Sequence, residues 1–177
     1  MNEMLSRAVT GTAAVARGVR DDQLGLPTPC DGFDVRELLD HLAWTAAMFE
    51  ALARREQPPS QDADHAPFAD RAAALLAAWS EPGVTEGTSP AMGMPMAMVL
   101  QLVLGDTVIH GWDLARATGQ DYTVDTATGE VVAAFVEGMA PQGRRLGVFG
   151  EEVPVARDAS PFERALGISG RDPAWKP

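Results

Sequence analysis

The segment Asp106-Thr-Val-Ile-His110-Gly-Trp-Asp113 sets three polar residues at positions i, i+4 and i+7 of an apolar run. On a helix these three side chains fall within about 60° of one another. Apolar residues with the same direction are Val99, Val103 and Ala117. The trio therefore lies on the stripe that should face the core of a helical protein. Because an unpaired buried charge is very costly, these groups should either bind one another or hold a metal ion.

Helical spacing of apolar residues recurs on both sides of this segment. It predicts helices over residues 3–20, 34–56, 68–79, 95–118 and 126–139, and a further helix that begins at Ser160-Pro161. Asp34-Val-Arg-Glu37 is a capping-box pattern, and Gly119 is typical of a helix C-terminus. Residues 149–155 look extended but short, and no strand–helix alternation is seen. The pattern indicates an all-α chain, a four-helix bundle with short C-terminal additions in one domain, 1–177.

Composition excludes several functional classes. The 177 residues carry a net charge of −11, which argues against nucleic acid as a partner. No apolar run is long enough to cross a bilayer and no export signal is seen at the N-terminus, so we expect no membrane partner and a cytoplasmic location. Cys30 is the single cysteine, which rules out an internal disulfide. With no histidine near it in sequence, Cys30 is not favoured as a nucleophile.

His41 extends the polar group to a second helix. Its direction on the 34–56 segment is shared by Asp34, Leu38, Thr45, Met48 and Leu52, so His41 also points inward. Helical bundles build metal sites from side chains on facing helices. Two imidazoles and one carboxylate, from His41, Asp106 and His110, suit a divalent transition metal that keeps positions open for water or substrate.

The residues alone leave alternatives open. Asp106 and His110 could form a hydrogen-bonded pair on one helix, and His41 could be a core histidine with satisfied polar atoms. Asp113 could be a fourth ligand, an acceptor that holds an imidazole N–H, or a charge that balances Arg116. The supporting acceptor is the preferred interpretation.

Other residues receive weaker predictions. Trp44 and Trp112 either pack in the core or form the wall of a pocket. Glu50 and Arg54 are expected on the solvated face of their helix. The 95–118 segment is apolar nearly all round, which fits burial or a homodimer interface.

Three motifs together resemble a known family. They are Asp34-Val-Arg-Glu-Leu-Leu-Asp-His41-Leu after a Pro-Cys-Asp-Gly turn, Val-Ile-His110-Gly-Trp-Asp-Leu-Ala-Arg-Ala-Thr-Gly-Gln120, and Asp158-Ala-Ser-Pro-Phe-Glu-Arg164 with Gly170-Arg-Asp-Pro173. This set is similar to the N-terminal metal-binding domain of mycothiol-dependent maleylpyruvate isomerases, within the DinB-like superfamily of four-helix bundles.

The resemblance implies a divalent metal, typically zinc, held by one histidine and a Glu-x-x-x-His pair. These positions correspond to His41, Asp106 and His110, with Asp in place of the usual Glu. It also implies mycothiol or a similar low-molecular-weight thiol as cosubstrate, and an isomerase or transferase acting on a small molecule. The named isomerase has a second domain, whereas only residues 121–177 follow the motif here. Maleylpyruvate isomerisation itself is therefore not expected, and a non-catalytic metal-binding or structural bundle is the alternative.

Overall fold

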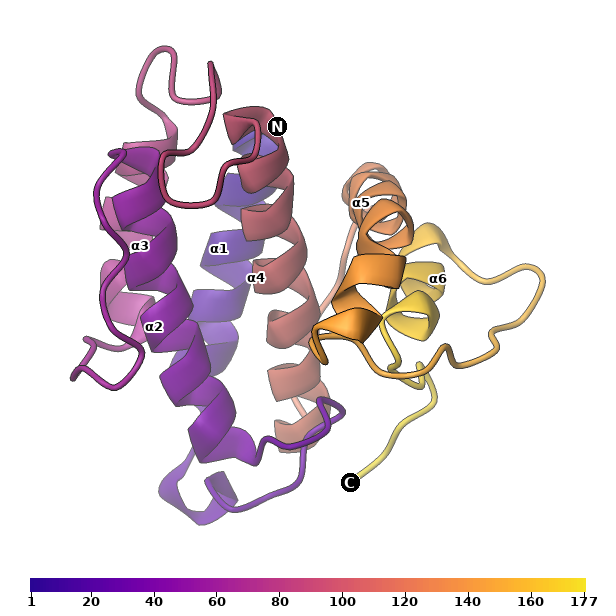
Figure 1. The fold of residues 1–177 in the computed structure, drawn as a ribbon. Coiled ribbons are helices and arrows are strands. Elements are labelled where there is room, and N and C mark those ends of the chain that lie inside the picture. The colour runs from indigo at the N-terminus through magenta and orange to yellow at the C-terminus, as the bar shows by residue number, and fades with distance from the viewer.

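The computed structural model describes all 177 residues, and helices carry the whole architecture (Figure 1). The elements are α1 (Asn2–Gly18), the 3₁₀ turn η1 (Asp21–Gln23), α2 (Val35–Ala53), α3 (Phe68–Trp79), α4 (Met96–Thr118), α5 (Thr126–Arg145) and α6 (Pro161–Ile168). Helices α1 to α4 form the bundle, and α5 with α6 packs on the side of α4 away from α2 and α3. The all-α, DinB-like bundle with C-terminal additions is confirmed.

The helix boundaries follow from local capping. Asp34 accepts a hydrogen bond from the Glu37 backbone N–H at 2.8 Å, and the Glu37 carboxylate accepts one from the Asp34 N–H at 2.9 Å. This reciprocal pair fixes the start of α2 and so the phase of every side chain along it. Helix α4 ends at Gly119, whose φ of 69° is the left-handed conformation that glycine adopts without strain.

Two expected helix ends were wrong. Helix α2 ends at Ala53, ahead of the Pro58-Pro59 pair, because the chain already turns at Arg55 with a φ of 61°. Helix α5 continues past Met139 to Arg145, with Pro141 inside it. A proline there removes one backbone hydrogen bond, and the Arg144 guanidinium donates to the Ile168 carbonyl and ties down the last turn.

The residues 149–155 form no strand. Their backbone bonds to the end of α6 instead, through Val153 N–H to the Gly167 carbonyl at 2.9 Å and Gly150 N–H to the Ser169 carbonyl at 3.2 Å. The extended look of this segment therefore reflects a loop laid along α6.

Helix α4 lies between two apolar cores. One core fills the four-helix bundle, where Val99 and Val103 are fully buried. The other fills the space between α4 and the α5–α6 pair, where Leu104 is fully buried. Most of the apolar circumference of α4 is thus covered within one chain, although Met98 near its start is exposed. The helix gives no argument for a homodimer, which stays a prediction.

Glu50 corrects the expectation of a solvated face. It is 6% exposed and its carboxylate pairs with Arg54 at 2.8 Å and with Arg71 of α3 at 2.6 Å. The expectation failed because α3 packs against this side of α2.

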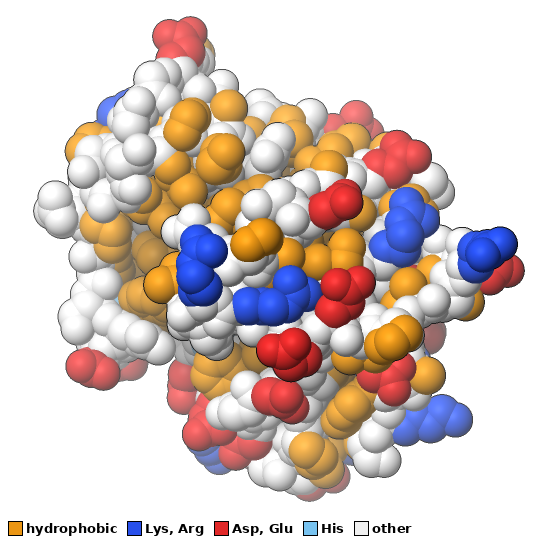
Figure 2. All heavy atoms as spheres, turned by 45° about the vertical axis from the view of Figure 1, so that its right-hand side comes forward, with side chains coloured by type: hydrophobic (Ala, Val, Ile, Leu, Met, Phe, Trp, Pro, Cys, Tyr) orange, Lys and Arg blue, Asp and Glu red, His pale blue; other side chains and the backbone are white.

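Two observations bear on partners. No helix is both long and apolar enough to pass through a membrane. On the face that carries α5 and α6, the few basic side chains lie scattered among acidic and apolar ones (Figure 2).

Candidate metal centre

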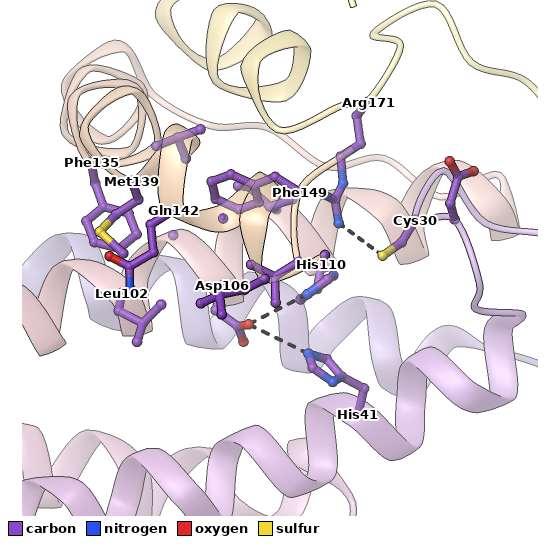
Figure 3. A pocket seen from close by; sticks show the side chains of 18 of the residues that line it. Cys30, His41, Leu102, Asp106, His110, Phe135, Met139, Gln142, Phe149 and Arg171 are labelled. Atoms are coloured by element: carbon purple, nitrogen blue, oxygen red, sulfur yellow. Dashed lines mark hydrogen bonds and ion pairs between the residues drawn. The ribbon is translucent and has the colours of Figure 1, made fainter. Parts of the chain in front are cut away.

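The structure brings His41, Asp106 and His110 together from the facing helices α2 and α4 (Figure 3). The Asp106 Oδ1 atom lies 3.7 Å from His41 Nε2 and 3.6 Å from His110 Nε2. The two imidazole rings meet edge to face with centroids 4.7 Å apart. All three side chains are at least 84% buried, so their polar atoms depend on one another or on a ligand for partners.

Two atoms of this group have no partner in the protein. His41 Nε2 and Asp106 Oδ2 are buried and make no hydrogen bond. Native proteins rarely leave buried polar atoms unpaired, and an ion is one of the standard explanations. A tetrahedral ion with ligands at about 2.0–2.1 Å holds neighbouring ligand atoms roughly 3.3–3.4 Å apart. The observed separations of 3.6 and 3.7 Å exceed this by a few tenths of an ångström, so the three residues fit such an ion.

The charge on Asp106 follows from its surroundings. Burial, the largest influence, works to raise the pKa of this carboxyl, but His110 and His41 together outweigh it and hold the pKa below its ordinary value. A metal ligand has to be ionised too, and a bound ion would supply the positive charge beside Asp106 once the histidines bind it as neutral rings. The Asp106 carboxylate lies within 4 Å of both imidazoles.

Asp113 supports the group from behind His110. Its Oδ2 atom lies 3.0 Å from His110 Nδ1, and an ionised carboxylate can only accept, so Nδ1 carries the proton. In the neutral ring this leaves the Nε2 lone pair directed at Asp106, the orientation a ligand needs. Arg116 does not pair with Asp113; it donates to the Pro173 and Trp175 carbonyls.

Arg171 is the residue that neutralises Asp113. The carboxylate is fully buried, and the guanidinium contacts its Oδ2 at 3.1 Å and its Oδ1 at 3.4 Å. Arg171 comes from the loop after α6, which reaches back across the bundle (Figure 3). The sequence pattern missed this role, since a partner 58 residues away leaves no spacing signal. Its place in the Gly170-Arg-Asp-Pro173 motif is the one clue.

Cys30 forms a second cluster with His110 and Asp113, all ligand atoms lying within 4.8 Å. Arg171 donates to Cys30 Sγ at 3.1 Å and is paired with Asp113, so a cation already occupies this group. Burial raises the pKa of the Cys30 thiol to about 11, and Arg171 only partly offsets that effect. The thiol is thus protonated at neutral pH, which suits neither a ligand nor a nucleophile.

A cavity of about 400 Å³ opens above the three residues. Figure 3 shows Leu102, Phe135, Met139 and Gln142 grouped at one end and Cys30 with Arg171 at the other. Helix α5 and the loop after it supply most of the apolar wall. The C-terminal additions therefore complete this site.

Trp44 and Trp112 do not line the cavity, which corrects the pocket-wall interpretation. Trp112 is 8% exposed, packs in the α4–α5 core and carries the Arg116 guanidinium 5.7 Å from its ring centre. Trp44 lies against His41 with ring centroids 5.8 Å apart, and its indole N–H donates to the Pro59 carbonyl.

The chain is similar to a known domain family and to a mycobacterial protein. The family model of the mycothiol maleylpyruvate isomerase N-terminal domain matches residues 5–71, a range that includes His41 and ends before Asp106. An uncharacterized protein of Mycobacterium tuberculosis, found in two strains, is 33% identical and aligns over 93% of this chain and 94% of its own length. No solved structure matches. The chain belongs to the family of the mycothiol maleylpyruvate isomerase N-terminal domain.

Proposed function

We propose that this chain binds a divalent transition metal, zinc in the first instance, through His41, Asp106 and His110. The observation that carries the proposal is the pair of buried, unpartnered atoms, His41 Nε2 and Asp106 Oδ2, at the floor of a cavity. Three protein ligands leave coordination positions for a small molecule, as catalytic zinc sites do.

The bound metal would serve a low-molecular-weight thiol, with mycothiol as the candidate that the family suggests. A bound divalent cation lowers the pKa of a coordinated thiol and so supplies a thiolate nucleophile at neutral pH. The chain's own residues prepare for this. Asp113 fixes the His110 ring, and apolar side chains form much of the cavity wall. We infer a transfer or isomerisation of a small molecule in the cytoplasm.

A second candidate is a non-catalytic bundle. Asp106 lies between two imidazoles at 3.6 and 3.7 Å, and one protonated histidine would balance its charge without an ion. This candidate predicts either protein that takes up no metal or a metal whose coordination sphere is closed to added thiol.

Metal analysis of freshly purified protein tests the proposal. We expect about one equivalent of metal per chain, lost in His41→Ala and in His110→Ala. The matched control is His65→Ala, since His65 is the remaining histidine and its ring hydrogen-bonds to the Ser60 carbonyl on the α2–α3 connector. Unchanged metal content in both site variants would refute the assignment.

Cobalt substitution then separates the two candidates. Mycothiol added to the Co²⁺-loaded protein should produce a thiolate-to-cobalt charge-transfer band, because the thiol enters an open position. A spectrum that mycothiol leaves unchanged would favour the non-catalytic bundle.

A further inference from the structure

The cavity above the proposed metal site lacks a free cationic side chain. Arg171 is the only Lys or Arg among its 19 lining residues. Its guanidinium is already engaged by the buried Asp113 carboxylate, by Cys30 Sγ and by the Ser169 carbonyl. The charge of Arg171 is thus balanced by Asp113 and is not available to an anionic ligand.

Negative charge, by contrast, is present in the cavity. Asp106 lies on its floor and Asp31 on its edge. A divalent metal would offset this charge at one point only, so a ligand with two carboxylates would leave at least one without a cationic partner. Burying an unpaired carboxylate is strongly unfavourable.

The rest of the cavity and its rim are mainly apolar, and Gln142 is the polar side chain among them. Leu102, Phe135 and Met139 line the end away from Arg171, and Phe149 lies between that end and Arg171. On the rim, Leu146 and Val148 are 67% and 64% exposed, the two most exposed large hydrophobic side chains of the chain. An apolar molecule that entered here would cover side chains that otherwise face water.

We propose that this cavity accepts a neutral small molecule with an apolar body, and discriminates against carboxylates such as maleylpyruvate. The inference rests on the proposed function, because the neutral molecule would be the second substrate that reacts with the metal-bound thiol. The apolar body lies among Leu102, Phe135 and Met139, with its reactive end toward Asp106. A cavity of about 400 Å³ suits a molecule with one ring or a short chain.

Binding of cinnamyl alcohol and of cinnamate tests the proposal, because the two share a carbon skeleton and differ in charge. Calorimetric titrations use the protein as purified and again after removal of metal by EDTA. We expect the alcohol to bind with a Kd at least about tenfold lower than cinnamate in both states. Because the metal-free arm needs no ion, its result is independent of whether the metal proposal stands.

Gln142→Arg supplies the cation that the cavity lacks. Gln142 lines the cavity and is exposed, so the substitution buries no charge in the core. Gln142→Arg should lower the ratio of the cinnamate Kd to the cinnamyl alcohol Kd several-fold. The matched control Gln61→Arg, on the α2–α3 connector, should leave this ratio unchanged.

Several results would overturn the inference. They are equal or tighter binding of cinnamate to the metal-free protein, no binding of either probe, and the same response in both arginine variants. Tight cinnamate binding that disappears with EDTA would also overturn it, while supporting the metal site.

Discussion

Arg171→Met should destabilise the fold far more than a surface substitution, because it leaves the buried Asp113 carboxylate without its cationic partner. Arg171 is 6% exposed and Asp113 is fully buried. Methionine keeps much of the apolar volume of the side chain and removes the guanidinium. The Asp113 carboxylate would then retain His110 Nδ1 as its one recorded partner.

The stability lost in Arg171→Met can be compared with the stability lost in Arg116→Met. Removing one partner of a buried ion pair costs about 3–5 kcal/mol, a large part of the roughly 5–15 kcal/mol that stabilises a typical domain. Arg116 also ties the C-terminal tail to α4, but through the Pro173 and Trp175 carbonyls. Arg116→Met removes those bonds, at about 1–2 kcal/mol, and leaves no charge behind. The difference between the two variants should therefore be about 2 kcal/mol.

Urea unfolding followed by circular dichroism measures both variants, with the m-value checked for constancy. The double variant Arg171→Met with Asp113→Asn should be more stable than Arg171→Met alone, since the neutral amide can still accept the His110 proton. The reasoning would be wrong if Arg171→Met cost no more than Arg116→Met. It would also be wrong if the Asp113→Asn change added a further loss in the double variant.

Two further outcomes follow from the packing and the caps. Gly111→Ala should cost about 1–3 kcal/mol in the same unfolding assay, because its Cβ would clash with the Thr12 hydroxyl and lie 2.7 Å from that of Tyr122. The control Gly138→Ala, whose Cβ meets nothing within 4 Å, should be neutral or stabilising, and equal losses would contradict the argument. The Thr128 N–H holds the pKa of Asp125 below its ordinary value of 3.8, so the ionised carboxylate adds stability above that pH and loses it as the pH falls. Asp125→Asn should lower stability at neutral pH, with a gap to the unchanged protein that closes in acid; a gap independent of pH would count against this.

The helices could be predicted because their signals are local. Each signal involves only a few neighbouring residues: the spacing of apolar residues, the Asp34–Glu37 capping box and Gly119. The structure contains the capping box at the start of α2 and Gly119 at the end of α4. The failures involve contacts between distant segments. Glu50 is buried because α3 packs beside it and supplies Arg71 as its partner. Helix α5 continues past Pro141, and Arg144 in its last turn bonds to the end of α6. No periodicity within one helix records such partners.

The candidate site divides in the same manner. Asp106 and His110 share one helix face, and His41 lies on an inward face of another, so their meeting could be predicted from helical phase alone. Arg171 and the apolar wall could not, because their positions depend on how the segment after α4 folds back. The pocket-wall interpretation of Trp44 and Trp112 failed for this reason, since α5 supplies the wall instead.

This division makes the two proposals separable in the molecule. The three proposed ligands belong to α2 and α4 of the bundle, whereas Phe135, Met139 and the rim belong to α5 and the loop after it. Substitutions in α5 should therefore change which molecules bind without changing metal content. Asp113 joins the two sets of residues functionally, because its carboxylate orients a proposed ligand and holds the C-terminal loop through Arg171. A change at Asp113 should alter metal affinity and ligand choice together, which no substitution confined to either half should do.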